Sequence, residues 1–160
     1  IRAGIVQPKS RGEVRLKSTD PRDPLVLDFR FLSNNDDLVL LREALKVARD
    51  CANQDALAPY RGVEITPGPG VQSDADLDEY IRNTVQTIEH PACTCPMGTG
   101  PDCVLDPDMK VRGIERLRVV DGSAMPDLTS AHINSAILMM AEKASDIIRG
   151  REPLPAEHVN

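Results

Sequence analysis

The sequence predicts an α+β fold in which a small antiparallel sheet is followed by packed helices. Apolar and charged side chains alternate over residues 12–32, which is the period of half-buried strands. Apolar side chains then recur every three or four positions over about 36–53, 73–90 and 133–150, as in amphipathic helices. The chain has 160 residues, 41% hydrophobic and 28% charged, which is typical of one globular domain.

Two strands account for residues 12–32. Val14 and Leu16 alternate with charged residues over 12–17, and over 25–31 the apolar side chains of one face are Leu25, Leu27, Phe29 and Phe31. Between them, residues 18–24 are polar and contain two prolines, which predicts a turn.

The first helix is expected over about 36–53. Asn34 and Asn35 are candidate N-caps, and the apolar face is formed by Leu38, Leu41, Leu45 and Ala48. Cys51, near its end, is expected in the core. A loop rich in proline and glycine follows over 58–70.

The second helix is expected to begin at Ser73, which forms a capping-box pattern with Asp76. It should end at His90, because a residue before proline, here Pro91, is disfavoured in a helix. Its apolar face would consist of Leu77, Ile81, Val85 and Ile88.

A cysteine-rich loop over 91–103 and short strands around Val111 and 117–120 lead to the last helix. That helix is expected to begin at Ile133, with His132 in its first turn and Thr129 or Ser130 as its cap, and to end at Gly150. The tail, residues 151–160, is polar and is expected to be loose.

Composition excludes several classes of function. The net charge is −6 and there are only four aromatic residues, so nucleic acid is an unfavourable partner. No apolar run is long enough for a membrane-spanning helix. Four cysteines are too few for a disulfide scaffold, so a reducing, cytoplasmic location is expected. The chain begins at Ile1, which indicates a processed product or a fragment.

Two histidines occupy positions that suit chemistry. His90 lies where a helix gives way to a loop, and His132 lies near a helix N-terminus, whose free N–H groups suit an anion. Both could equally be ordinary polar histidines at helix ends. A Cys₃His zinc site formed by His90, Cys93, Cys95 and Cys103 is a further alternative, although the single residue between Cys93 and Cys95 is short for structural zinc.

No nucleotide fingerprint is present, because the glycines of 68–70 and 98–101 fail the G-x-G-x-x-G pattern. However, residues 90–98 resemble the H-P-x-G-T-C-x-M-G motif of the glucose–methanol–choline (GMC) flavin oxidoreductases. Further family motifs are matched, in order, by residues 8–16, 105–114, 116–126 and 130–144. The resemblance covers about residues 7–150.

The resemblance implies a fragment of a larger two-domain flavoprotein. Residues 1–150 would be the C-terminal, substrate-side domain, of which 116–150 would complete the FAD-binding half. The partner of this chain would be the N-terminal FAD-binding half, which it lacks. We therefore expect the isolated chain to be inactive.

The resemblance also implies FAD as cofactor and a primary or secondary alcohol as substrate, with oxygen or a quinone-type acceptor. His90 would be the general base, His132 would hydrogen-bond the alcohol oxygen, and hydride would pass to flavin N5, giving an aldehyde or ketone. Asp121 and Gly122 would approach the FAD phosphates and ribityl chain. His132, Ile133 and Asn134, at the helix N-terminus, would stabilise the reduced flavin.

Two departures and two alternatives accompany this resemblance. Cys93 stands where the family has glycine, and the second histidine, His132, favours members acting on sugars or aryl alcohols over choline enzymes. A hydroxynitrile-lyase-like member would bind FAD without redox turnover, and the zinc-stabilised structural module remains the other possibility.

Overall fold

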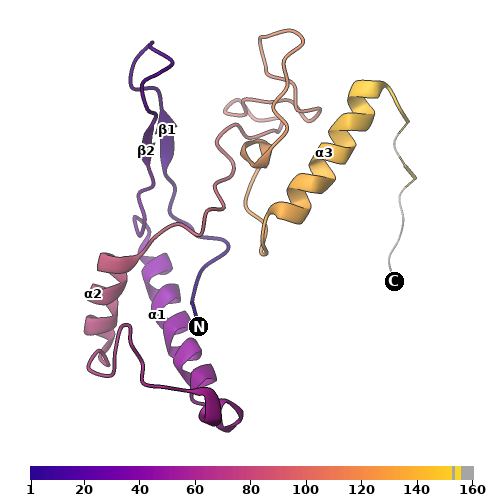
Figure 1. The fold of residues 1–160 in the computed structure, drawn as a ribbon. Helices are drawn as coiled ribbons and strands as arrows, with labels where there is room; N and C mark the ends of the chain where they lie inside the picture. The colour runs from indigo at the N-terminus through magenta and orange to yellow at the C-terminus, as the bar shows by residue number, and fades with distance from the viewer. Residues whose placement is uncertain (153, 156–160) are drawn as a thin grey trace. The chain divides into compact units, whose positions relative to one another are not determined.

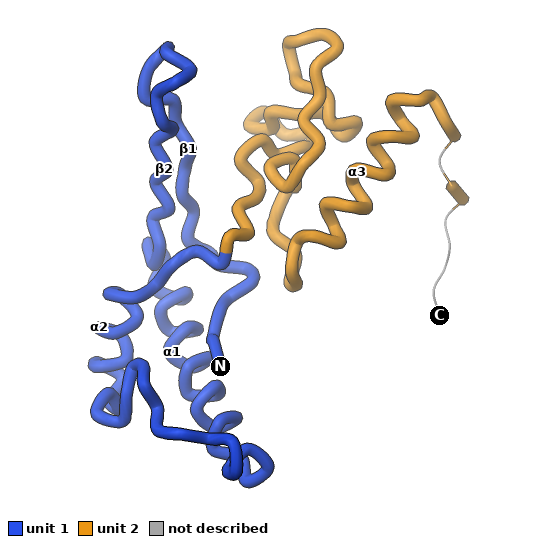
Figure 2. The backbone as a smooth tube through the Cα atoms, in the orientation of Figure 1, with its two compact units in different colours: residues 1–88 blue, residues 89–160 orange. Residues whose placement is uncertain are grey.

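The structure, a computed structural model, describes residues 1–152, 154 and 155. Over this range the chain forms two strands, three α-helices and two short 3₁₀ helices, in the order β1, β2, α1, η1, α2, η2, α3 (Figure 1). The chain divides into two compact units, residues 1–88 and 89–160 (Figure 2). The predicted α+β class with a small antiparallel sheet is confirmed.

The hairpin of the first unit consists of β1 (Glu13–Arg15) and β2 (Val26–Asp28), paired antiparallel with Val14 opposite Leu27. The strands are shorter than expected. Arg30 and Leu32 adopt φ angles of 46° and 59°, which interrupt the extended conformation. The apolar side chains of the hairpin are mostly exposed rather than half-buried, although the rings of Phe29 and Phe31 stack with centroids 5.0 Å apart.

Helices α1 (Asn35–Ala52) and α2 (Asp74–Thr84) pack together in the same unit. Asn34 caps α1 by accepting a hydrogen bond from the Asp36 N–H, and Ser73 with Asp76 forms the predicted capping box of α2. Leu38, Leu77 and Ile81 are buried. Between the helices lies η1 (Asp55–Tyr60), which the sequence did not predict.

Two predictions for the helices of this unit are wrong. Helix α2 ends at Thr84 rather than His90, because the β-branched residues that follow favour extended backbone: Val85 has a ψ of 133°. Ile88 is consequently exposed. Cys51, expected in the core, is exposed in the last turn of α1. Successive residues of a helix point in directions about 100° apart around its axis, so Cys51 and Ala52 cannot both face the core. Ala52 is the more covered of the two.

The core of the second unit is built mainly from short apolar segments and one face of α3 (Asn134–Arg149). Its buried members are Leu105, Met109, Ala124, Met125, Ile133, Met140 and Ala144. The expected short strands occur as isolated bridges, Leu105 with Val111 and Lys110 with Arg118. Gly150 ends α3 with a φ of 64°, as predicted. None of the described helices is long and apolar enough to cross a membrane.

Candidate active site

The structure brings His90 and His132 into direct contact within the second unit. Nδ1 of His132 lies 2.7 Å from Nε2 of His90, and the ring planes are inclined by 64°. A contact this short requires a proton between the two nitrogens, so one ring donates an N–H and the other accepts it. Two facing N–H groups would repel each other, so the pair holds one proton at this contact whether or not it is charged.

Three backbone hydrogen bonds fix the loop that carries His90. The N–H groups of Cys93, Cys95 and Met97 donate to the carbonyl oxygens of residues 122, 123 and 124, at 3.1, 2.9 and 3.0 Å. The acceptors form η2 (Gly122–Ala124), which the sequence did not predict. The ladder places the loop along a segment that precedes α3 closely, and so brings His90 toward His132.

Gly122 allows this close approach. A Cβ atom at Gly122 would lie 3.2 Å from Cδ1 of Ile137 and 3.4 Å from the carbonyl oxygen of Pro91. Any side chain would therefore press on the His90 loop and on α3 together. The residue that the sequence singled out for cofactor contact is buried, and its carbonyl is already engaged by Cys93.

The backbone on both sides of His90 is left-handed. Glu89 has a φ of 62° and Cys93 a φ of 66°. For a residue with a side chain this conformation costs about 1–2 kcal/mol, whereas glycine adopts it freely. The glycine of the family motif at this position therefore has a physical reason, and Cys93 adopts the same backbone at a cost.

His132 adjoins the uncapped N-terminus of α3. Unlike α1 and α2, this helix has no side-chain cap: its N-cap is Ile133, whose side chain is in the core. The prediction that Thr129 or Ser130 caps the helix is wrong, because both precede the N-cap by three residues or more, and the Thr129 hydroxyl donates to the carbonyl of Ala131 instead. His132 accordingly lies just before the helix rather than in its first turn.

This arrangement suits an anionic ring or oxygen beside the two histidines. The N–H groups of the first helical turn, beginning at Asn134, have no partner within the helix and carry its positive dipole end. The residues present thus fit the flavin that the motifs imply. The Asp121 carboxylate caps η2 by accepting a hydrogen bond from the Ser123 N–H at 2.8 Å.

A zinc site receives no support from the described residues. No three of their His, Cys, Asp and Glu side chains gather in a way that could hold a metal ion. Cys93, Cys95 and Cys103 form no disulfide bonds with one another, and each is partly buried. The loop geometry around them is set by backbone hydrogen bonds instead.

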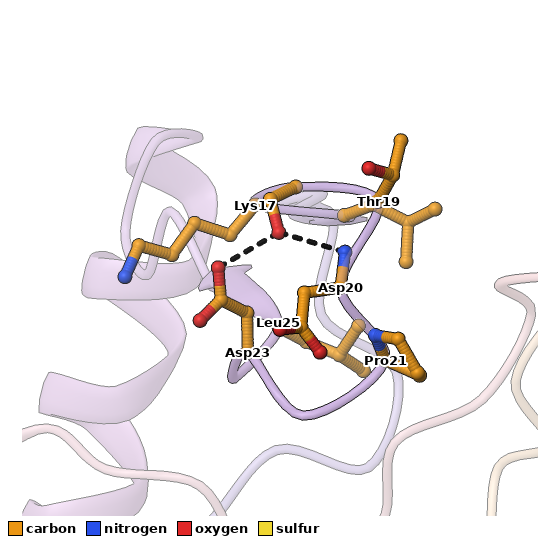
Figure 3. Close-up of a pocket in the computed structure, with 8 residues that line it drawn as sticks. Lys17, Thr19, Asp20, Pro21, Asp23 and Leu25 are labelled. Atoms are coloured by element: carbon orange, nitrogen blue, oxygen red, sulfur yellow. Dashed lines mark hydrogen bonds between the residues drawn. The ribbon is translucent and has the colours of Figure 1, made fainter.

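A hollow of about 200 Å³ lies at the turn of the hairpin, in the other unit, and is lined by Leu16 to Leu25 except Arg22 and Pro24 (Figure 3). Ser18, Asp20 and Asp23 are hydrogen-bonded to one another there. The Ser18 hydroxyl donates to Asp23 at 2.7 Å and accepts from the Asp20 N–H at 3.0 Å. We assign no chemistry to this hollow.

Comparison with known proteins gives consistent results. The family model of GMC oxidoreductases matches residues 8–141. Oxygen-dependent choline dehydrogenase of Pseudomonas aeruginosa (strain LESB58) is 47% identical over 152 residues, which cover 95% of this chain and 27% of that protein. The enzyme of the same name from Staphylococcus saprophyticus is 45% identical over 100% of this chain and 29% of its own length.

Solved structures extend the similarity to the fold. Pyridoxine 4-oxidase from Mesorbium loti superposes with a TM-score of 0.85 at 35% identity, covering 92% of this chain and 29% of that one. A fungal aryl-alcohol oxidase superposes with a TM-score of 0.74 at 37% identity, over 89% and 24%. Proteins named for choline and proteins named for aryl alcohols are both similar to this chain. The comparisons therefore do not decide the preference for aryl alcohols over choline that His132 suggested.

The chain thus spans less than a third of the length of these relatives. Its ordered motifs, the paired histidines and the match over residues 8–141 agree with one another. This chain belongs to the GMC oxidoreductase family and corresponds to its C-terminal domain.

Proposed function

We propose that this chain is the substrate-side part of an FAD-dependent alcohol oxidoreductase, in which His90 and His132 together accept the hydroxyl proton of the alcohol. The observation that carries the proposal is the 2.7 Å contact between the two rings. It is supported by the names of the similar proteins, which include a choline dehydrogenase, a pyridoxine oxidase and an aryl-alcohol oxidase.

The chemistry needs a proton acceptor near the alcohol oxygen. Removal of hydrogen from the carbinol carbon becomes easier as the hydroxyl proton leaves. In this proposal FAD supplies the two-electron oxidant for that carbon. The histidine pair takes the proton, and the resulting single positive charge is shared across the contact between Nδ1 of His132 and Nε2 of His90.

The pair is well suited to accept one proton. When both rings are neutral, one of them keeps a ring nitrogen lone pair that is not used in the contact. An alcohol hydroxyl that donates to this lone pair is oriented and then deprotonated by the same nitrogen. The first turn of α3 lies beside His132, where its N–H groups would stabilise the negative charge gained by the oxidant.

The test uses the full-length protein that contains this chain, purified with its flavin. Anaerobic mixing with choline, pyridoxine or an aryl alcohol is expected to bleach the flavin absorbance. His90→Ala should slow bleaching by at least about a hundredfold, since general-base catalysis contributes about 10²–10⁴. Lys143→Ala, an exposed change on α3, is the control and should bleach as the unaltered protein does.

Two results would count against the proposal. Near-normal bleaching in His90→Ala, with flavin still bound, would refute the assignment of the base. Bound flavin that no alcohol bleaches, in a protein that nevertheless cleaves a cyanohydrin, would favour the hydroxynitrile-lyase-like alternative.

A further inference from the structure

Arg118 is a cation of the second unit with a buried donor that lacks an acceptor among the described residues. Among the described residues its guanidinium makes no hydrogen bond or ion pair, and its Nε is fully buried without an acceptor. Removing an N–H donor from water without replacing its hydrogen bond is unfavourable, and more so when the group is charged. Arg118 as a whole is only partly buried, so the accessible part of its side chain is open to an acceptor from outside the described residues.

The strand pairing around Arg118 strengthens this expectation. Arg118 forms an antiparallel bridge with Lys110, flanked by the hydrogen bonds Val111 N–H to Leu117 and Val119 N–H to Met109. These bonds lie outside the pair, so the two residues form a non-hydrogen-bonded pair, in which facing side chains are closest. Two cations thus share one face at short range, an arrangement that is destabilising by itself.

Little nearby charge offsets these cations. Lys110 lies 3.7 Å from the exposed Asp108, which is a weak, solvent-screened contact. Residues 110–118 contain four cations, namely Lys110, Arg112, Arg116 and Arg118, and one carboxylate, Glu115, in a chain whose net charge is −6. This segment is therefore positively charged although the chain as a whole is negatively charged, and its charge favours the binding of an anion.

We propose that Arg118 binds an oxyanion, either a carboxylate from the remainder of the full-length protein or a phosphate of its bound dinucleotide. Both groups accept two parallel hydrogen bonds from a guanidinium, which suits arginine better than lysine. The second source rests on the proposed function, since it requires FAD.

The test compares Arg118→Met, Arg118→Lys and Arg149→Met in the full-length protein. Arg149 is exposed in the last turn of α3, so Arg149→Met removes the same charge without emptying a buried contact. The measurements are the thermal midpoint of the flavin-free protein and the dissociation constant for added FAD.

A carboxylate partner predicts that Arg118→Met lowers the midpoint of the flavin-free protein by at least about 3 °C relative to Arg149→Met. A phosphate partner predicts a flavin-free midpoint no lower than that of Arg149→Met, because loss of Arg118 relieves its repulsion with Lys110, and about tenfold weaker FAD binding. Arg118→Lys should lie between Arg118→Met and the unaltered protein in either case, because it keeps the charge but not the paired donors.

The proposal is overturned if Arg118→Met matches Arg149→Met in both measurements. If Arg118→Met yields no folded protein, the yield of folded Arg118→Lys is compared with it. A yield of Arg118→Lys no better than that of Arg118→Met would show that packing, not charge, is needed at this position. Failure of the unaltered protein to bind FAD would refute the proposed function, while the carboxylate arm would still be measured on the flavin-free protein.

Discussion

Asp37 anchors the entry of the chain onto α1, and its substitution by asparagine tests how much that anchor contributes. The side chain is only 3% exposed. Its Oδ1 accepts the N–H of Lys9 and its Oδ2 accepts the N–H of Ser10, both at 2.8 Å. Asparagine has one acceptor oxygen, so Asp37→Asn places an NH₂ group against one of these two donors.

The magnitude follows from the two hydrogen bonds. A hydrogen bond to a charged group contributes about 1.5–3 kcal/mol, against about 0.5–1.5 kcal/mol for a neutral one. Asp37→Asn loses one charged bond and weakens the other to a neutral one. We therefore expect the free energy of unfolding to fall by about 2–4 kcal/mol at pH 7.

The effect should depend on pH in a defined direction. Burial disfavours the charged carboxylate, but hydrogen bonds from the Ser10 hydroxyl and from the N–H groups of Lys9 and Ser10 outweigh it. The pKa of Asp37 is therefore lowered from 3.8. A carboxylate with a lowered pKa stabilises the fold fully above its unfolded pKa and loses that contribution as the pH falls through the folded value. The difference between Asp37→Asn and the unaltered protein should be constant above about pH 5 and shrink below about pH 4.

Urea unfolding followed by circular dichroism measures this difference, with Asp36→Asn as the matched control. Asp36 is the neighbouring carboxylate, but it is exposed and pairs with the exposed Lys9 ammonium group. The free energy of unfolding of Asp36→Asn should therefore match that of the unaltered protein. Equal losses in the two variants, or a difference that grows as the pH falls, would refute the reasoning.

Substitutions at three further positions, Gly98, Leu105 and Cys93, test the second unit by urea unfolding. Gly98→Ala places a Cβ 2.7 Å from the Cys103 sulfur and should cost about 1–3 kcal/mol; a double-mutant cycle with Cys103→Ala should show relief of that cost, and strict additivity would contradict it. Leu105→Ala empties a fully buried position and should cost about 2–5 kcal/mol, whereas a loss below about 1 kcal/mol would mean that the site collapses around it. Cys93→Gly should stay within about 1 kcal/mol of the unaltered protein, since relief of the left-handed strain offsets lost packing and entropy. Cys93→Val should be clearly less stable than Cys93→Gly, because a β-branched side chain is poorly tolerated at a φ of 66°; equal stability of the two would contradict the strain argument.

Three of the helix caps are among the features that the sequence predicted best, whereas the N-terminal cap of α3 was predicted wrongly. Asn34, Ser73 with Asp76, and Gly150 occupy the positions expected of them. Each acts over three or four residues through one or two hydrogen bonds, so its effect does not depend on the rest of the molecule. The family motifs were likewise read directly, and they led to the correct family and domain.

Element ends were predicted less well where local preferences compete. The apolar period suggested that α2 continues to Ile88, but the β-branched residues from Thr84 onward end it at Thr84. Periodicity similarly extended β2 to Phe31, although the positive φ of Arg30 interrupts the strand. In both cases the spacing of apolar residues carried no information on the backbone angles of individual residues.

The sequence by itself determined the three α-helices, the N-caps of α1 and α2, the C-cap of α3, the family and the choice of the two histidines. Only the tertiary structure decided that His132 Nδ1 lies 2.7 Å from His90 Nε2, across 42 positions of the chain. It also decided that Gly122 is buried between Pro91 and Ile137 and that Arg118 faces Lys110. Caps and periodic faces arise from neighbours within a turn or two, whereas these contacts depend on how distant segments pack. Packing of that kind is a property of the whole unit, which no local pattern of residues specifies.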